Sequence, residues 1–572
     1  MSDWKHQELR EEMARREVGH TRIAPALSRV IIALFLIVIL SVPAVQHLSE
    51  FRSFLSGERR SPLPQAWDVF SLLPAAMKAS GTAGPAWIEN IFAVNRNLLK
   101  EMKKYEETLD DQSAIGKWLR PRIQYALTAW LGAGNEKAYC GSRPWLFYRP
   151  GIDYLAGPPF LDPVQLRKRG TGGDEWAAPT EPDPRAAILH LHEQLSRRGI
   201  ALIVMPTPIK AMIHPEKLSG RYGRQAEALQ NPSYRRFKEE MEGAGVLVFD
   251  AAPALMEWKR QSGRAQFLAS DTHWRPEAME KVAAGLKEFI DRHVDLPPLP
   301  PAGYGGESDE VTHLGDLAVM LSLPVNQRIF PSEKVTIRKI TGDGGEAWQP
   351  HPNADVLVLG DSFSNIYSLG AMGWGEGAGF IEHLSLAMQR PLDRITRNDN
   401  GSFATREFLA GEMARGRDRL AGKRLVIYQF AIRELAVGNW KRIDLKIGTP
   451  EPVNYLTLPP GTERIIRGRI KAVSSVPRPG TVPYKDHVMA IHLTELTAEG
   501  RPLTETDAMV YMSSMTDNAL TAAARYRPDE MVALRLSSWT DVAGRYEGIN
   551  RSELDDEALQ LVEPCWGEPL QK

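Results

Sequence analysis

The chain has 572 residues, and its 70 Lys and Arg against 71 Asp and Glu give a formal net charge of -1. This balance excludes binding to nucleic acid through bulk positive charge. The length predicts about two to four domains. Only two cysteines occur, Cys140 and Cys565, which excludes a disulfide scaffold and a cysteine-based zinc site. A single disulfide between them stays open.

An apolar run near the N-terminus is the first distinct element. It extends from Val30 to Leu40 and on to Val45, and Arg29 is the only charged residue between Ala24 and Val45. Such a run approaches the roughly 20 residues that cross a bilayer. A buried core helix and a cleaved signal peptide are the alternatives. We expect an uncleaved anchor over 30–48, with residues 1–29 in the cytoplasm because they carry Lys5, Arg10, Arg15, Arg16, Arg22 and Arg29.

Helical and strand patterns alternate over the middle of the chain, after a helical linker region expected at 49–139. Residues 142–150 form an extended aromatic segment, and 168–183 have the Gly and Pro content of a loop. Helices are predicted from Asp183-Pro184, Asn231-Pro232 and Pro276, and buried strands at 200–205, 246–249, 356–359 and 425–428. This alternation predicts a three-layer α/β domain with a parallel sheet over 140–448.

The pattern changes after Gly448. Runs of β type occur at 464–470, 487–493, 508–512 and 531–536, with turn residues between them. We therefore expect a small all-β, barrel-like domain over 449–572. The proline-containing segment 476–487 is either an exposed binding loop or a rigid connection.

Two short motifs carry residues suited to nucleophilic catalysis. Gly360-Asp361-Ser362 directly follows a predicted strand, where a tight turn can project a serine at the carboxyl edge of the sheet. Asp271-Thr272-His273-Trp274 offers a base for that serine and a carboxylate to orient the base. A capping serine and a structural histidine are the alternatives for each motif alone. No metal-ligand spacing appears, so we expect neither a metal nor another cofactor.

Several segments together resemble a known family. Residues 360–364 resemble the serine block of the SGNH hydrolases, and 271–274 resemble the Asp-x-His-Trp motif of their alginate O-acetyltransferase branch, known as AlgJ/AlgX-like. In that branch, as here, the Asp/His block precedes the serine block. Further similar segments are 145–155, 202–210 with 214–217, and 428–435, so that the resemblance covers about residues 140 to 436.

The resemblance implies roles for individual residues. Ser362 would be the nucleophile, His273 the general base and Asp271 the group that orients it. The Ser362 backbone N–H would donate to the oxyanion, and the Asn400-Gly401 turn is a further candidate for oxyanion or substrate binding. Trp274 either forms a wall of the site or packs in the core.

The resemblance also implies a function and its partners. It implies acetyl transfer to a hydroxyl of an exported polysaccharide, together with a multi-span membrane O-acyltransferase that supplies acetyl groups. The protein would be a single-pass protein of the bacterial inner membrane with its catalytic domain in the periplasm. A carbohydrate esterase with the same triad and a non-catalytic polysaccharide-binding export protein are the alternatives. The β-rich tail does not resemble that of the alginate enzymes, so the polymer is left open.

Overall fold

The structure, a computed structural model, describes residues 24–55, 63–70, 72, scattered positions between 94 and 110, 113–171, 180–223, 227–398, 400–448, 454–477, 479, 482, 484–554, 559 and 562–570. The predicted basic residues at positions 5, 10, 15, 16 and 22 lie outside the described residues. So do 172–179 of the predicted loop and four positions of the 476–487 segment. The chain divides into two compact units, residues 1–123 and 124–572.

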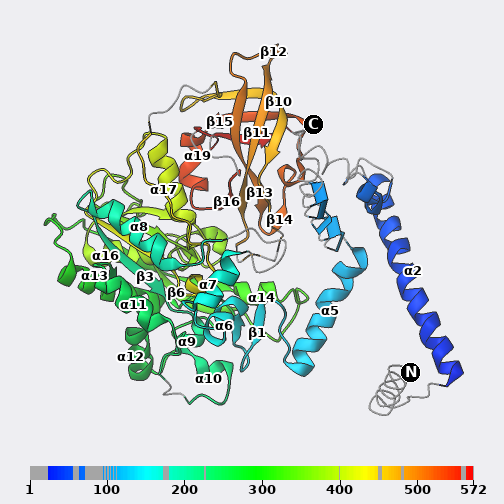
Figure 1. Cartoon of the computed structure of the whole chain (residues 1–572), viewed down its shortest axis with the longest axis horizontal. Helices are drawn as coiled ribbons and strands as arrows, with labels where there is room; N and C mark the ends of the chain where they lie inside the picture. The colour runs from blue at the N-terminus through cyan, green and yellow to red at the C-terminus, as the bar shows by residue number, and fades with distance from the viewer. Residues whose placement is uncertain are drawn as a thin grey trace, which may run out of the picture. The chain divides into compact units, whose positions relative to one another are not determined.

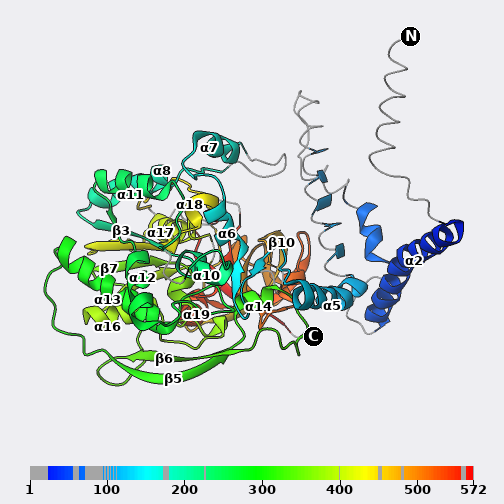
Figure 2. The same cartoon turned by 90° about the horizontal axis from the view of Figure 1, so that it is seen from below.

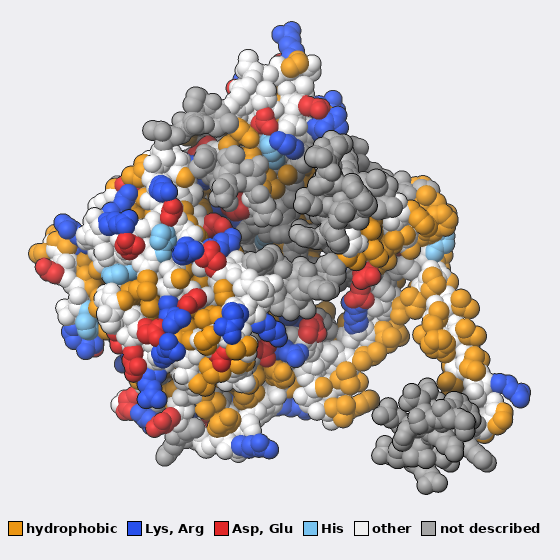
Figure 3. Space-filling view, in the orientation of Figure 1, with side chains coloured by type: hydrophobic (Ala, Val, Ile, Leu, Met, Phe, Trp, Pro, Cys, Tyr) orange, Lys and Arg blue, Asp and Glu red, His pale blue; other side chains and the backbone are white. Residues whose placement is uncertain are grey.

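The apolar run forms a helix in the N-terminal unit. Helix α2 (Pro25–Leu55) has 31 residues, none of them buried, and hydrophobic side chains cover it along its length (Figure 3). Its length and hydropathy suit either a membrane span or a signal sequence. The 3-10 helix η1 (Gln65–Asp68) and the start of α5 (Ala114–Leu131) belong to the same unit.

A parallel sheet forms the centre of the second unit (Figures 1 and 2). Its strand order is β4 (Leu247–Val248), β3 (Ala201–Thr207), β9 (Leu425–Ala431), β7 (Val356–Gly360) and β8 (Asp393–Thr396), and every neighbouring pair is parallel. Helices α8 (Pro184–Ser196) and α11 (Tyr234–Gly243) cover one face, and α13 (Pro276–His293) and α16 (Phe380–Met388) cover the other (Figure 2). The predicted three-layer α/β architecture is confirmed.

Local sequence signals set several of these elements. The Asp183 carboxylate accepts the N–H of Arg185 and so caps α8, as its position before Pro184 predicts. Strands β7 and β9 are buried along their whole length, which matches their continuous apolar runs. The remaining helices of this region are α6 (Arg149–Ala156), α7 (Pro163–Gly170), α9 (Lys210–Ile213), α10 (Pro215–Leu218), α12 (Ala252–Ser262), α14 (Asp316–Met320), α15 (Ser362–Asn365), η2 (Gly370–Met372), α17 (Ala404–Ala414) and α18 (Glu434–Val437).

Four features differ from the sequence expectations. Helix α7 extends to Gly170, so the predicted loop at 168–183 begins three residues later; the Asp162 cap holds this helix in place. Strand β8 was not predicted. Neither was the antiparallel pair of β5 (Gly305–His313) and β6 (Glu333–Thr341), whose outward side chains are mostly exposed. The aromatic segment contains only a short strand, β2 (Leu146–Tyr148), paired with β1 (Ala138–Cys140).

The C-terminal part forms the expected barrel-like β domain. Strands β10 (Glu463–Val473), β11 (His487–Ala498), β13 (Asp507–Thr516), β17 (Cys565–Pro569) and β15 (Met531–Ser538) form a closed ring in this order. Smaller elements accompany the ring: β12 (Arg501–Pro502), β14 (Ala519–Leu520), η3 (Ala523–Arg525), α19 (Trp539–Tyr546) and β16 (Asn550–Ser552). Cys565 is buried in the ring and Cys140 lies in β1, and both are free thiols, so the disulfide left open by the sequence does not form.

The barrel contacts the α/β domain directly. Arg397 Nη1 donates to the Glu547 carbonyl oxygen at 3.0 Å, and the Asn398 N–H donates to Asn550 Oδ1 at 2.8 Å. On another part of this interface, Arg417 pairs with Glu563. The two domains therefore belong to one compact unit, and the barrel reaches the carboxyl edge of the parallel sheet just after β8.

Candidate active site

Ser362 lies at the turn between β7 and α15. Gly360 ends the strand, and a Cβ atom there would be 2.5 Å from Ser364 Oγ, so the close approach of this turn requires glycine. Asp361 is held by Gln429 of the neighbouring strand: its N–H donates to Gln429 Oε1 at 2.9 Å, and Gln429 Nε2 donates to Asp361 Oδ1 at 2.8 Å. These bonds fix the backbone that presents the serine hydroxyl.

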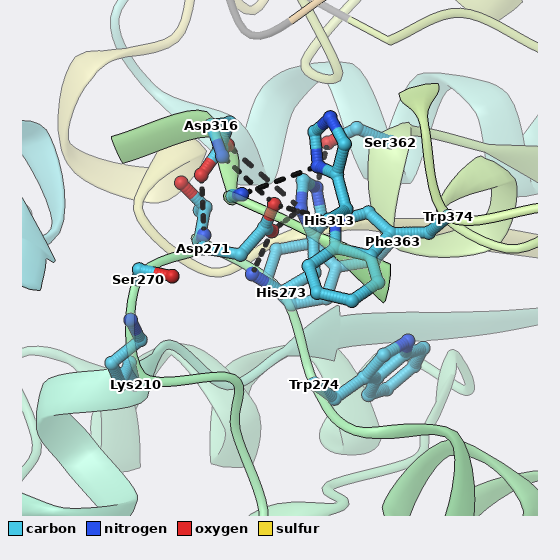
Figure 4. A network of polar contacts seen from close by, with 12 residues as sticks. Lys210, Ser270, Asp271, His273, Trp274, His313, Asp316, Ser362, Phe363 and Trp374 are labelled. Carbon is cyan, nitrogen blue, oxygen red and sulfur yellow. Dashed lines mark hydrogen bonds and ion pairs between the residues drawn. The ribbon is translucent and has the colours of Figure 1, made fainter. Parts of the chain in front are cut away.

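His273 and Ser362, 89 residues apart in sequence, meet at hydrogen-bond distance (Figure 4). His273 Nε2 is 2.9 Å from Ser362 Oγ, and His273 Nδ1 is 2.7 Å from Asp271 Oδ1. The three residues are 1–2% exposed. A proton on Nδ1, donated to Asp271, leaves Nε2 free to accept from the serine hydroxyl. The three side chains thus have the geometry that nucleophilic catalysis requires of a nucleophile, its base and an orienting carboxylate.

The Asp271 carboxylate receives four N–H groups. Oδ1 accepts from the backbone N–H and Nδ1 of His273, and Oδ2 accepts from the Asp316 backbone N–H and from Trp374 Nε1. Burial by itself would raise the pKa of Asp271, but these bonds and the nearby His273 outweigh it and hold the pKa well below its ordinary value. The carboxylate therefore remains charged and oriented toward the imidazole.

Asp316 and Trp374 are part of this network and were missed by the sequence analysis. Burial, together with the charge of Asp271, raises the pKa of Asp316 to about 6. Its Oδ1 accepts the Thr272 N–H at 2.7 Å, which holds the loop carrying His273. No sequence signal identified these residues. In the structure, Gly315 has a φ of 91°, and a Cβ there would be 2.5 Å from the Ser270 carbonyl oxygen, so glycine is required beside Asp316.

The carboxylates and the histidine also have a spacing that metal sites show. Ligand atoms of Asp271, His273 and Asp316 lie within 4.8 Å of one another. However, Asp271 already accepts four N–H groups, and His273 bonds Asp271 and Ser362 through its two ring nitrogens. Because the Asp271 oxygens and the His273 ring nitrogens already have these hydrogen-bond partners, the arrangement fits proton transfer between side chains better than metal coordination.

Trp274 lies in the core beneath the site. It is 0% exposed, and its ring packs edge-on against Phe363 at 5.3 Å between ring centroids and at a tilt of 34° against Phe380 at 5.5 Å. Its carbonyl oxygen accepts the Tyr367 hydroxyl at 2.7 Å. Of the two interpretations from sequence, the packing role agrees with this position.

The Asn400-Gly401 turn lies beside the site, but Asn400 itself is exposed. A Cβ on Gly401 would be 3.4 Å from Asp361 Oδ2, which places Gly401 next to the serine turn. Asn398, rather than Asn400, is the amide that contacts the helix carrying Ser362. It is buried, and its Oδ1 accepts Asn365 Nδ2 at 2.7 Å, one helical turn after Ser362. Within the described residues, Asn398 Nδ2 has no hydrogen-bond partner.

The parallel sheet and the position of its serine define an SGNH hydrolase-like domain. Residues 168–431 match the family described as SGNH hydrolase-like domain, acetyltransferase AlgX. This match confirms the resemblance seen in the sequence for residues 168–431, which are slightly less than half of the chain.

The particular relatives are proteins named probable alginate O-acetylase AlgJ. The one from Azotobacter vinelandii is 26% identical over 255 residues, which are 44% of this chain and 58% of that protein. The one from Pseudomonas aeruginosa is 33% identical over 196 residues, 32% of this chain and 49% of that protein. The chain thus spans about half the length of the curated relatives it matches. Among solved structures, the O-acetyltransferase domain of Pseudomonas putida AlgJ has a TM-score of 0.39 and 20% identity, covering 53% of this chain and 94% of that one.

Proposed function

We propose that the α/β domain transfers acetyl groups to hydroxyls of an exported polysaccharide. The observation that supports this most strongly is the contact of His273 Nε2 with Ser362 Oγ at 2.9 Å, backed by Asp271 at 2.7 Å. The family that residues 168–431 match is described as an acetyltransferase, which supports acetyl as the transferred group. The AlgJ relatives are named as probable alginate O-acetylases, which supports a polysaccharide as the acceptor.

The reaction has two steps that use the same residues. Ser362 Oγ attacks the acetyl carbonyl carbon while His273 Nε2 takes the serine proton, and the bond to the leaving group breaks as His273 returns that proton. An acetyl-serine ester remains. His273 then accepts the proton of a sugar hydroxyl, whose oxygen attacks the ester and releases Ser362 with its proton restored.

The carbonyl oxygen becomes negative in each step and needs donors. The Ser362 backbone N–H is one, and we propose Asn398 Nδ2 as the other because it has no partner within the described residues and borders the helix that carries Ser362. Gly401 lies on the same side of the turn but contributes no side-chain donor. This assignment replaces the exposed Asn400 with a buried amide two residues earlier.

The acceptor decides between transfer and hydrolysis, since both reactions use the same buried residues, Ser362 at 2% and His273 at 1% exposure. Transfer is favoured because residues 168–431 match an acetyltransferase family and the relatives are named as acetylases. A carbohydrate esterase remains the second candidate because it would use the same residues with water. We further propose that α2 anchors the protein in the bacterial inner membrane. The domain then lies in the periplasm, where a multi-span O-acyltransferase supplies acetyl groups.

The test supplies the detergent-solubilised full chain with an activated acetyl ester, with and without polyuronate or neutral oligosaccharides. We expect acetylated sugar above the hydrolysis background and an acetylated peptide containing Ser362 by mass spectrometry. Both should disappear in Ser362→Ala and persist in Ser196→Ala, which alters an exposed serine of α8. Ester hydrolysis that no sugar affects would indicate the esterase. Unchanged transfer by Ser362→Ala would overturn the assignment of Ser362 as nucleophile, whereas neither transfer nor hydrolysis by the parent chain would favour a binding role.

A further inference from the structure

Helix α5 presents an apolar stripe to solvent. Leu119, Ile123, Leu127 and Trp130 follow one another at helical spacing and are 37%, 48%, 38% and 84% exposed. The other side of the helix is used for internal bonds: Thr128 Oγ1 donates to the Ala133 carbonyl oxygen at 2.8 Å. The helix therefore has one face committed to the fold and one apolar face open.

The charges on α5 all have one sign. Between Ala114 and Leu131 the helix carries Lys117, Arg120 and Arg122 and no acidic residue. Aromatic and aliphatic side chains combined with basic ones characterise helices that lie in the headgroup region of a bilayer, where long basic side chains reach the phosphates. An anionic lipid surface thus complements both the stripe and the charge.

A contact with α2 sets the depth of α5. Gln46 is the first polar residue after the apolar run that ends at Val45, and its Oε1 accepts the Ala114 N–H at 2.8 Å. If α2 spans the membrane, Gln46 lies at the boundary between acyl chains and headgroups, and the first turn of α5 lies at the same level. The η1 segment, bonded to Glu50 through the Gln65 N–H at 2.8 Å, adds the exposed Trp67 near this level.

We propose that α5 is a second membrane contact, lying in the headgroup region of the leaflet where α2 ends. Its apolar stripe faces the acyl chains, and Arg122 contacts anionic phosphates. Arg120 pairs with Asp110, and Lys117 lies on the face turned toward water. The proposal rests on the membrane anchor within the proposed function. It assigns to the expected linker region, 49–139, a membrane contact in addition to the α2 anchor.

Spin labels on the full chain test this contact. In a Cys140→Ser/Cys565→Ser background, one nitroxide is placed at Ile123→Cys and a matched control at Lys117→Cys, on another face of the helix. In vesicles of phosphatidylethanolamine and phosphatidylglycerol, we expect the label at 123 to collide more with oxygen than with a water-soluble nickel chelate. The label at 117 should show the opposite preference. Replacing phosphatidylglycerol with phosphatidylcholine should weaken the difference.

Equal access of nickel to both labels in these vesicles would overturn the proposal. Shielding of position 123 in native membranes but not in vesicles would also overturn it, because a protein partner would then cover the stripe. Alkaline extraction separates this result from failure of the anchor: a chain released by alkali lacks the α2 span, whatever the labels report.

A second inference concerns the barrel, and it rests on the proposed role of Asn398. Two bonds hold Asn398: Asn365 Nδ2, from the helix that carries Ser362, donates to its Oδ1 at 2.7 Å, and its own N–H donates to Asn550 Oδ1 at 2.8 Å. Asn550 is 1% exposed and belongs to β16, which pairs with barrel strand β11. The barrel thus fixes the backbone of the residue that would stabilise the oxyanion.

We infer that Asn550 is a positioning residue for acetyl transfer. Without its carbonyl oxygen, the buried Asn398 N–H loses its acceptor, and the backbone that aims Nδ2 is released. Misplacement of a catalytic group by about 1 Å can cost about 100-fold in rate. The effect should therefore appear in kcat, while binding of the acceptor, measured by KM, should change little.

The test compares Asn550→Ala, Asn550→Asp and Glu563→Gln in the full chain. We expect Asn550→Ala to lower kcat at least about 10-fold. The loss should stay smaller than the about 10²–10³-fold loss that follows removal of an oxyanion donor itself. Asn550→Asp retains an acceptor oxygen and should recover most of the rate. Glu563→Gln breaks the ion pair with Arg417 elsewhere on the same interface and should leave kcat unchanged.

An unchanged kcat in Asn550→Ala would overturn the inference. An equal loss in Glu563→Gln would do so as well, because it would indicate general loosening of the interface. Thermal unfolding of each variant identifies loss of fold. Failure of the proposed function itself is separate, since it would appear as activity that survives Ser362→Ala.

Discussion

Asp271→Asn should abolish most of the acetyl transfer without altering the shape of the site. Each carboxylate oxygen of Asp271 faces two N–H donors. Whichever way the new amide turns, its NH₂ group meets donors that need an acceptor. If the imidazole adapts by moving its proton to Nε2, that nitrogen can no longer accept from Ser362, which it contacts at 2.9 Å.

The expected loss is about 10⁴-fold in kcat/KM, equivalent to ~5.5 kcal/mol in the activation barrier. It is measured as acetylated oligosaccharide formed from an activated ester. Asp316→Asn is the matched comparison, since its Oδ1 can still accept the Thr272 N–H, and we expect a far smaller loss. If Asp271→Asn remained within about 10-fold of the parent enzyme, His273 would not be the base, because orientation by this carboxylate is worth more than that.

Further predictions concern stability and the buried residues around the triad. The pKa of Asp316 in the fold is about 6, above its ordinary 3.8, so its contribution is present below about pH 4 and is lost as the pH rises through 6. Asp316→Asn should therefore gain in Tm relative to the parent chain as the pH rises from about 4 to about 6 and should keep that gain at higher pH; a difference that is the same at pH 4 and pH 7 would contradict the assignment. The pKa of Asp271 is held below its ordinary value, so its contribution to the free energy of unfolding is present above about pH 4 and is lost below it. In urea unfolding, the free energy of unfolding of Asp271→Asn should therefore fall less steeply below pH 4 than that of the parent chain. Trp274→Leu should lower the free energy of unfolding by about 2–4 kcal/mol with KM for the acceptor unchanged, whereas a raised KM would restore Trp274 as a wall of the site. Lys210→Met should destabilise by about 3 kcal/mol in urea unfolding, because Nζ donates to the buried carbonyl oxygens of Leu146 and Ala269, and a neutral result would contradict this.

The strands made of continuous apolar runs could be predicted from the sequence, whereas strand β8, which contains charged residues, could not. The segments at 200–205, 356–359 and 425–428 all lie in the parallel sheet because their local composition already describes burial on both faces. Strand β8 begins with Asp393, which is 0% exposed. Its carboxylate pairs with Lys423 at 3.1 Å and with Arg419 at 2.7 Å, and both residues lie beyond helix α17 in the sequence. A local pattern cannot show that a charge will be neutralised by distant residues.

The sequence alone predicted the candidate triad: each motif by itself left a structural alternative open, and the resemblance of several segments in the same order implied the roles of Ser362, His273 and Asp271. It could not determine Asp316, Trp374 or Asn550, which reach the site from 45, 103 and 152 residues away from their partners. Only the tertiary structure brings these groups together. The physical reason is that a buried carboxylate or amide must find hydrogen-bond partners wherever the fold places them, and the chain carries no local record of which segment will supply them.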